Sequence, residues 1–206
     1  MIYDITPPVT PETAVFPGDT SMSREVLLDM KNGDALTLST LRGTAHLGAH
    51  ADGANHYGVD APPIDEMPID HYLGICEVID CTNAAGRRLL IQDLLQPVDA
   101  ERILLKTGTW PDCTKFNTDF AGLSIELVGH LAARGVRTIG IDTPSVDLAD
   151  SKDLPAHRAI LNHKLAILEC LDLTGVPAGA YELIALPLKL VGFDASPVRA
   201  VLRTVG

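Results

Sequence analysis

Three histidines and one aspartate lie close together in the first third of the chain: His46, His50, Asp52 and His56. Imidazole and carboxylate groups are the ligands that divalent metals such as zinc and manganese accept. The residues between these four are mostly small, and Gly48 is one of them. Small residues let a loop fold tightly enough for several ligands to meet at one point.

The spacing restricts the backbone that could bring these side chains together. A straight strand would put all four on one face but would separate His46 from His50 by roughly 13 Å, too far to share an ion. A regular helix would bring these two histidines together and point Asp52 and His56 elsewhere. We therefore predict a bent loop that leaves a strand and folds around a metal. The alternative is a histidine-rich surface loop without a metal.

Two further ligand candidates lie in the second half of the chain. His157 falls in the segment Pro155–His163, which has helical spacing and a proline at the helix start. Glu169 interrupts a hydrophobic run that we predict to be a buried strand. A buried carboxylate is costly unless it is paired or bound to a metal, so we predict that Glu169 binds one. The alternatives are a salt bridge for Glu169 and a surface position for His157.

The chain resembles the metal-dependent cyclase-like amidohydrolases, and most closely the bacterial kynurenine formamidases. The resemblance covers nearly the whole length and rests on six segments in the same order: Phe16–Thr20, His46–Tyr57, Gly140–Asp147, His157–Glu169, Tyr181–Leu188 and Ser196–Val201. It implies a centre of two divalent metal ions, zinc or alternatively manganese. The ligands that it implies are His46, His50, Asp52, His157 and Glu169, with Asp52 and Glu169 shared between the ions. It also implies that His56 is the catalytic acid/base.

One position departs from the formamidase pattern. Those proteins usually carry tryptophan before Pro-Gly-Asp-Thr, where it lines the substrate pocket, whereas this chain has Phe16. Phenylalanine keeps an aromatic face but loses area and the indole N–H. The resemblance therefore makes Phe16 a candidate substrate-binding residue. Considered without the resemblance, residues 16–19 are a type II turn, with Pro17 second and Gly18 third.

The function that follows from the resemblance is hydrolysis of N-formyl-L-kynurenine to L-kynurenine and formate, a step in tryptophan degradation. Zinc can lower the pKa of water to about 7, which would supply the nucleophile. An arylamine leaves poorly without a proton, so His56 would deliver one. Two alternatives remain: another amidohydrolase of the superfamily, such as an isatin-hydrolase-like enzyme, and a metal-binding protein that is not a catalyst.

Many short apolar runs alternate with turn residues, which predicts an α/β or α+β domain around a mixed sheet. The predicted strands are Arg24–Met30, Leu36–Leu41, Cys76–Cys81, Arg102–Lys106, Arg137–Asp142, Ala166–Leu171, Tyr181–Leu186 and Val198–Leu202, after an N-terminal strand. The predicted helices are Ile91–Gln96, Ser124–Arg134 and Pro155–His163, with Ser124 as N-cap and Gly135 as C-terminal stop. The resemblance implies that residues 1–206 form one α/β domain with a swivelling β/β/α fold. It also implies a homodimer or higher homo-oligomer, in which the N-terminal segment approaches the neighbour's site.

Composition excludes several other classes of protein. The chain has 206 residues and a formal net charge of −11, which makes non-specific nucleic-acid binding unfavourable. No apolar run approaches the length of a membrane span, and the N-terminus lacks the pattern of a signal peptide, so a cytoplasmic protein is expected.

The remaining polar and reactive residues have no clear place in the predicted site. The four cysteines (Cys76, Cys81, Cys113 and Cys170) have no metal or redox spacing. The loop Asp142–Asp147 is interpreted as a proline-containing turn, Glu182 as an ion-pair partner, and Trp110 as a packing residue.

Overall fold

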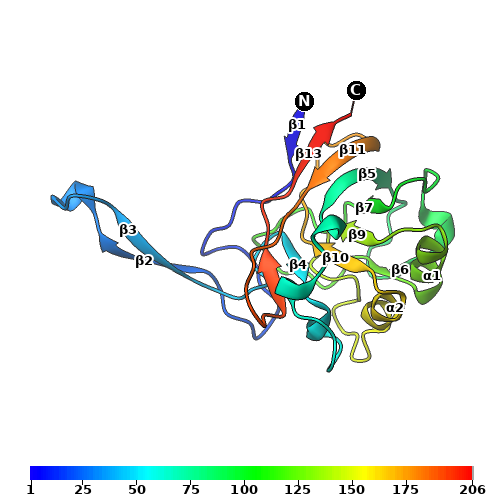
Figure 1. Cartoon of the computed structure of the whole chain (residues 1–206), viewed down its shortest axis with the longest axis horizontal. Coiled ribbons are helices and arrows are strands. Elements are labelled where there is room, and N and C mark those ends of the chain that lie inside the picture. The colour runs from blue at the N-terminus through cyan, green and yellow to red at the C-terminus, as the bar shows by residue number, and fades with distance from the viewer. Residues whose placement is uncertain (206) are drawn as a thin grey trace.

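One mixed sheet of nine strands forms the centre of the computed structural model, which describes residues 1–205 (Figure 1). The four middle strands, β5, β7, β9 and β10, are parallel, and the outer strands pair antiparallel to their neighbours. In spatial order the strands are β1 (Ile2–Asp4), β13 (Val201–Thr204), β11 (Gly179–Ile184), β5 (Leu73–Asp80), β7 (Arg102–Lys106), β9 (Thr138–Ile141), β10 (Ala166–Glu169), β4 (His50–Asp52) and β12 (Ala195–Pro197).

Two helices, α1 (Ile125–Ala133) and α2 (Pro155–His163), pack against each other beside the parallel strands (Figure 1). The Ser124 hydroxyl accepts a hydrogen bond from the Leu127 amide and so caps α1, and Gly135 follows the helix with φ +85°, as predicted. The remaining elements are a small parallel pair, β6 (Arg88–Leu89) and β8 (Gly122–Leu123), and the 3-10 turns Met30–Asn32, Ala54–His56, Ile64–Glu66, Ile69–His71 and Ile91–Asp93. Among residues 1–205, no helix has both the length and the apolar character needed to cross a membrane.

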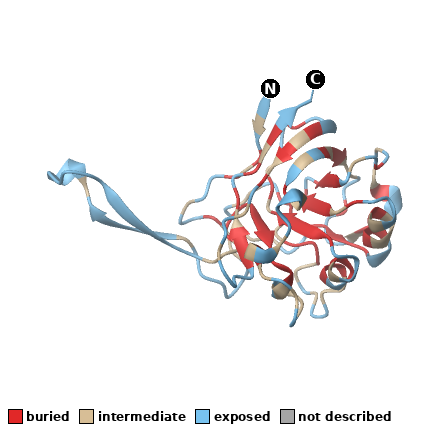
Figure 2. Cartoon of the chain, in the orientation of Figure 1, coloured by how far each residue is buried: buried red, intermediate tan, exposed pale blue. Residues whose placement is uncertain are grey.

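The sheet separates two hydrophobic cores, because successive side chains of a strand point to opposite faces. Ile103 and Leu105 of β7 join the core beneath the helices, whereas Leu104 joins the opposite core. That second core contains Ala51 from one end of the sheet and Leu202 from the other. Since distant strands share one core, the sheet curls around it (Figure 2).

Gly140 on β9 shows how closely the second core is packed. A β-carbon at this position would lie 2.3 Å from Cδ2 of Leu104 and 2.8 Å from Cδ1 of Leu171. The sheet can therefore pack here only with glycine, because Leu171, in the loop that follows β10, lies directly against it.

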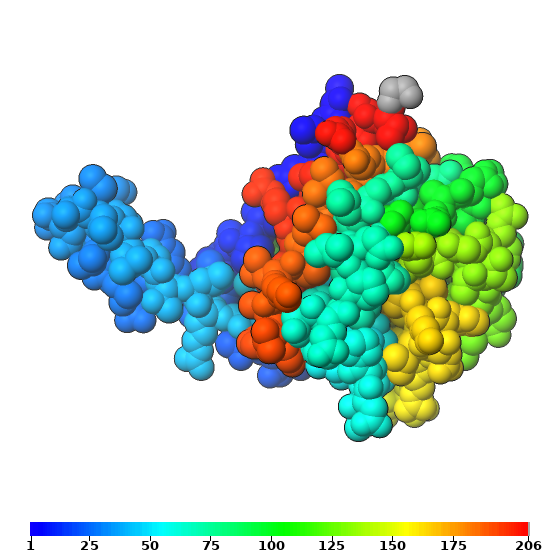
Figure 3. Space-filling view, viewed as in Figure 1, coloured from blue at the N-terminus to red at the C-terminus, as the bar shows by residue number. Residues whose placement is uncertain are grey.

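A hairpin of β2 (Ser23–Leu28) and β3 (Leu38–Arg42) projects from this body as an arm (Figures 1 and 3). Every residue of both strands is exposed (Figure 2). The arm leaves the body between Phe16 and His46, so both of its ends connect to predicted site residues.

The structure confirms most predicted elements, with boundaries shifted by a few residues, and corrects two of them. Residues 91–96 are not an α-helix, because only Ile91–Asp93 form a 3-10 turn and Leu94 then pairs with Cys81 as an isolated bridge. The last predicted strand starts later, at Val201. Ala195–Pro197 pair with β4 at one end of the sheet and Val201–Thr204 pair at the other, so the residues between them must cross from one end to the other.

Candidate metal centre

The strand β4 fixes the first two candidate ligands. His50 and Asp52 are two residues apart on this strand, so their side chains share a face. The register places Glu169 of β10 directly opposite His50. The sequence predicted a loop here, and that prediction was wrong for residues 50–52, because these residues pair with β10 on one side and β12 on the other.

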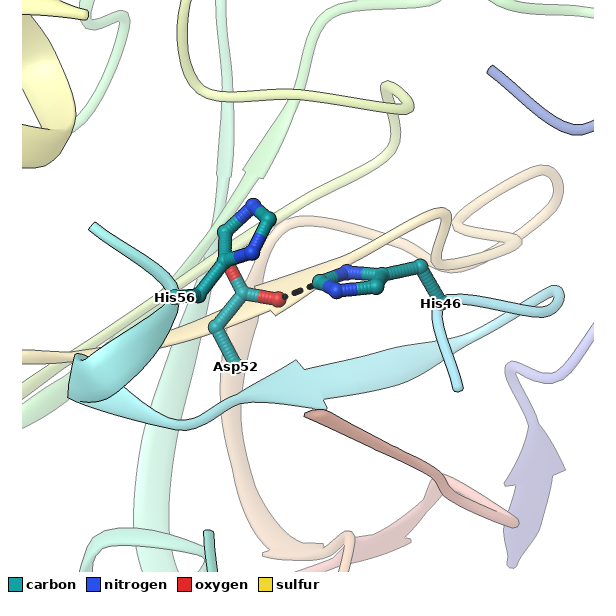
Figure 4. A group of neighbouring side chains, drawn as sticks. All are labelled: His46, Asp52 and His56. Atoms are coloured by element: carbon teal, nitrogen blue, oxygen red, sulfur yellow. Dashed lines mark ion pairs between the residues drawn. The ribbon is translucent and has the colours of Figure 1, made fainter. Parts of the chain in front are cut away.

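His46 and His56 approach the same point from the two ends of β4 (Figure 4). Gly48, with φ +61°, bends the chain before the strand, and the 3-10 turn Ala54–His56 bends it afterwards. Nδ1 of His46 lies 3.3 Å from Oδ1 of Asp52, and the imidazole centroids of His46 and His56 are 4.3 Å apart. The bent backbone predicted from the spacing is therefore present on both sides of the strand.

Helix α2 and strand β10 bring the second-half candidates to the same place. Nε2 of His157 lies 3.8 Å from Oδ2 of Asp52 and 3.8 Å from Oε1 of Glu169. Nε2 of His50 lies 3.3 Å from Oε2 of Glu169. The structure thus gathers all the candidate ligands around Asp52.

Two groups of side chains have donor atoms close enough to share an ion. One group is His46, Asp52 and His56, and the other is His50, Asp52 and Glu169. Asp52 belongs to both groups, which fits a carboxylate shared between two ions. The first group also contains His56, the residue predicted to be the acid/base, so by distance alone His56 is equally able to bind a metal.

Buried polar atoms without partners show that a cation fits this cluster. Both carboxylate oxygens of Asp52 and Nε2 of His50 are buried and make no hydrogen bond with any residue in the described range 1–205. Burial of carboxylate oxygens that make no hydrogen bond is strongly unfavourable. A divalent cation would compensate these atoms directly, and the set of imidazoles and carboxylates suits zinc or manganese.

The buried imidazole and carboxylate groups of this cluster shift each other's pKa values. Burial by itself raises the pKa of Asp52, but the nearby imidazoles of His46, His50 and His56 outweigh it and hold the pKa below its usual value. Burial lowers the pKa of His50, whereas Cys170, Glu169 and Asp52 raise it well above its usual value. Protons on the imidazoles therefore balance the buried carboxylates, and a metal ion would replace those protons.

His56 differs from its neighbours in this respect. Burial lowers the pKa of His56, and the charge of His46 lowers it further, while Asp52 and Glu169 raise it in part. The net result is a pKa below the ordinary value, so the imidazole of His56 is neutral near pH 7. A neutral imidazole in a cavity can accept a proton.

Asp147 belongs to this site, although the sequence analysis interpreted its loop as a turn. Its fully buried Oδ2 accepts hydrogen bonds from Nδ1 of His157 at 2.8 Å and from the His157 amide at 3.0 Å. Oδ1 accepts from Arg88 at 2.6 Å and from the amide of Ala156 at 3.2 Å. Asp147 therefore caps α2 and fixes the ring of His157 at once. The sequence signal was weak, because the partner lies ten residues away across a loop.

Asp194 is a second acidic residue that the sequence analysis missed. Its Oδ2 lies 3.1 Å from Nε2 of His46 and 3.7 Å from Nδ1 of His56. The residue precedes β12, and nothing in the sequence around it indicates a site. It comes close only because β12 pairs with β4.

A cavity of about 260 Å³ opens above these ligands. Phe16, the predicted substrate-binding residue, lines it together with Phe116, and the two rings meet edge to face with centroids 5.0 Å apart. Phe116 in turn contacts Trp110 and the fully buried Phe120. An aromatic wall anchored in the core thus faces the candidate ligands, and Trp110 is confirmed as a packing residue.

The other residues singled out from the sequence lie outside the ligand cluster, apart from one cysteine. Asp142 accepts hydrogen bonds from the amides of Thr107 and Gly108 and so joins the loops after β7 and β9. Glu182 pairs with Arg203 on the neighbouring strand, as expected. The cysteines are free thiols, and Cys170 lines the cavity beside Glu169.

Comparison with known proteins agrees with this architecture. A structure described as a potential metal-dependent hydrolase with cyclase activity shares 26% sequence identity, covers 98% of this chain and 96% of its own, and superposes with a TM-score of 0.85. A predicted metal-dependent hydrolase from Bacillus stearothermophilus shares 27% identity over 98% and 97% of the two chains, with a TM-score of 0.82. Isatin hydrolase A from Labrenzia aggregata, at 24% identity over 98% and 93%, has the same fold, with a TM-score of 0.80.

A family assignment rests on the sequence itself. Residues 3–148 match the Cyclase family, described as "Putative cyclase". The matched region includes β4 and the bends on both sides of it, with four of the clustered side chains (His46, His50, Asp52 and His56). The α/β fold with its curled mixed sheet agrees with the cyclase-like structures named above. The chain therefore belongs to the cyclase family.

Proposed function

We propose that this protein is a metal-dependent hydrolase of aryl formamides, and that its substrate is N-formyl-L-kynurenine, which it converts to L-kynurenine and formate. The observation that carries the proposal is that both carboxylate oxygens of Asp52 are buried without a hydrogen bond where two groups of potential ligands meet. Histidines of these groups line a cavity that also has an aromatic wall. Two of the similar structures named above, at 26% and 27% identity, are described as metal-dependent hydrolases, potential or predicted, which supports the reaction class.

Five side chains would hold the metal in this proposal: His46, His50, Asp52, His157 and Glu169. Asp52 and Glu169 would contribute to both ions of a two-metal centre, with zinc the expected metal and manganese the alternative. When bound, the ions would supply Lewis acidity, which acidifies water and polarises an amide carbonyl.

The chain's own residues supply positioning and proton transfer. The aryl ring of the substrate would pack against the side chains of Phe16 and Phe116, which form the aromatic wall. This position would point the formyl group toward the ligand cluster. His56, neutral because burial lowers its pKa, would take a proton from the attacking water. It would then return this proton to the nitrogen of the arylamine, which is a poor leaving group without it.

A second reaction of the same class has one observation in its favour. Isatin hydrolases share the fold over nearly the whole chain, and a planar bicyclic ring would also fit beside Phe16 and Phe116. Isatin is a cyclic aryl amide, so the same cluster could open its ring with water.

One sample can separate these functions. We would measure the metal content of the purified protein and then its rates on N-formylkynurenine and on isatin. Chelation should abolish activity and lower Tm, and added zinc or manganese should restore both, because the ligands bind metal only when folded. Faster turnover of isatin would favour the second function, whereas bound metal without hydrolysis of either amide would indicate a non-catalytic metal-binding protein. Full activity without metal would refute the proposal.

We also propose that the chain forms a homodimer through the arm. Apolar side chains of the arm are exposed on both strands, including Leu27 at 51% and Leu41 at 66%. An isolated hairpin is marginally stable in water, and exposed apolar clusters mark contact surfaces. A second copy is the proposed partner, because segment 186–193 of the body also exposes apolar side chains that could cover the arm. Leu27→Glu with Leu41→Glu should convert a dimer to a monomer in light scattering, and a wild-type monomer would contradict the proposal.

A further inference from the structure

The turn that carries Phe16 also presents a carboxylate to the cavity. Asp19 lines the same cavity as Phe16, three residues further along the chain. The amide of Asp19 donates to the carbonyl of Phe16 at 2.9 Å, and Gly18 has φ +98°, which is the geometry of a type II turn. One turn therefore fixes an aromatic face and an acidic group beside each other.

This turn is held in place from two sides. The amide of Ala14 donates to the carbonyl of Cys113, in the loop that carries Phe116, at 2.8 Å. The amide of Thr44 donates to the carbonyl of Thr20 at 3.1 Å, on the segment that leads to His46. The position of Asp19 relative to the aromatic wall and the ligand cluster is thus set by hydrogen bonds.

The carboxylate of Asp19 has no cationic partner within the described part of the chain. Its Oδ1 accepts the amide of Thr20 at 2.7 Å, and no salt bridge to it occurs among residues 1–205. The side chain is exposed at the mouth of the cavity. In the same range of residues, no Lys or Arg side chain lines the cavity, so no lysine ammonium or arginine guanidinium group is available there to pair with an anionic group.

We propose that Asp19 selects aryl amides that carry an ammonium group, which it binds at the mouth of the pocket while Phe16 and Phe116 hold the ring. The proposal rests on the function proposed above and names a feature of its substrate. N-formylkynurenine carries an aliphatic amine on a short chain attached to its ring, and such amines are protonated at neutral pH. Isatin has no such group, so Asp19 would separate the two substrate classes.

Three aryl formamides of similar shape test the proposal. N-formylkynurenine has an amine and a carboxylate, N-formylkynuramine has only the amine, and 2-formamidoacetophenone has neither. Asp19→Asn keeps the oxygen that accepts from Thr20 and removes the charge. We expect it to lower kcat/KM by about three- to tenfold for both amines relative to the neutral ketone, mainly through KM. The difference should shrink as ionic strength rises.

A matched control is Asp150→Asn, which removes one negative charge from an exposed position outside this cavity. It should leave the ratio between the amines and the neutral ketone unchanged. An equal loss on all three substrates in Asp19→Asn would show that Asp19 only shapes the turn, and this outcome would overturn the proposal. A loss restricted to the substrate with a carboxylate would overturn it as well.

Binding of products keeps the test independent of catalysis. Kynuramine and 2-aminoacetophenone differ in the ammonium group, and their Kd values can be measured by calorimetry on the metal-loaded protein. A preference of the wild type for kynuramine that disappears in Asp19→Asn supports the proposal even if no formamide is hydrolysed. Hydrolysis of all three formamides without any preference for an amine would instead refute the proposed role of Asp19, while the proposed hydrolase function would still hold.

Discussion

Nδ1 of His157 lies 2.8 Å from Oδ2 of Asp147, so Nδ1–H donates a hydrogen bond to the carboxylate and Nε2 of the ring faces Asp52 and Glu169. The same carboxylate accepts hydrogen bonds from two backbone amides at the start of α2. The helix terminus and the orientation of its histidine therefore depend on one buried side chain. Such partners of metal-binding histidines fix the tautomer of the ring.

The first prediction concerns Asp147. Asp147→Asn should weaken metal binding by about 10- to 100-fold, because the amide cannot hold the His157 ring as the carboxylate does. Competition with a chromogenic chelator measures this affinity. Asp150→Asn, three residues along and exposed, is the control. Unchanged metal affinity in Asp147→Asn would show that His157 is not a ligand or needs no such support.

The second prediction separates a ligand from an acid/base. His56→Ala should keep most of the bound metal and lose turnover by roughly 100-fold or more, the usual size of general acid–base catalysis. His50→Ala should lose metal as well as activity, because Nε2 of His50 lies inside the buried cluster. Measuring metal content and kcat on the same preparation of each variant distinguishes a metal ligand from an acid/base. If His56→Ala empties the site while His50→Ala does not, the two roles are exchanged.

The sequence predicted much of this site for a physical reason. Imidazoles and carboxylates at positions 46 to 56 and 157 to 169 are a costly combination if buried without a cation, so residue type made them candidates, and the family resemblance joined them into one centre. The spacing did not reveal β4, because a three-residue strand between two bends has no measurable periodicity. Its existence depends on pairing with β10 and β12, which come from far along the chain.

The partners of the ligands were beyond sequence reasoning for the same reason. Asp147, Asp194 and Phe116 reach the site through tertiary contacts between loops, and each alone is an ordinary loop residue. The helix expected over residues 91–96 does not form because its backbone is paired with the end of β5: the Leu95 amide donates to the carbonyl of Asp80, and the Thr82 amide donates to the carbonyl of Asp93. The carboxylate of Asp93 is held by Arg87 and Thr82.

The third prediction uses this buried carboxylate. Hydrogen bonds from Arg87, Thr82 and the Leu90 amide outweigh burial and hold the pKa of Asp93 well below its usual value, Arg87 having the largest effect. Asp93→Asn should lower the free energy of unfolding at pH 7 by roughly 1–3 kcal/mol. Because the folded pKa is depressed, this contribution is complete above the unfolded pKa of about 3.9 and is lost as pH falls through the folded pKa.

Urea denaturation of metal-free protein tests the pH dependence. The difference in free energy between the wild type and Asp93→Asn should be constant from pH 7 to about pH 5 and shrink below about pH 4. Asp60→Asn, at an exposed position, serves as the control. A difference that grew toward low pH would contradict the depressed pKa of Asp93.

The fourth prediction tests the aromatic wall at the position that departs from the formamidases. Phe16→Ala should raise KM for N-formylkynurenine without changing metal content, because burial and aromatic contact contribute about 1–3 kcal/mol. Phe16→Trp should be tolerated, since the edge contact with Phe116 can be kept by a larger ring. The measurement is kcat/KM for N-formylkynurenine and for a small aliphatic formamide in all three proteins.

The comparison between the two substrates decides what Phe16 does. An aliphatic formamide has no ring to place against Phe16, so its kcat/KM should hardly respond to Phe16→Ala. An equal effect on both substrates would mean that Phe16 stabilises the turn at residues 16–19 and packs against Phe116, and does not contact the substrate ring. The aryl specificity would then have to come from Phe116 alone, and Phe116→Ala in the same assay would show whether it does.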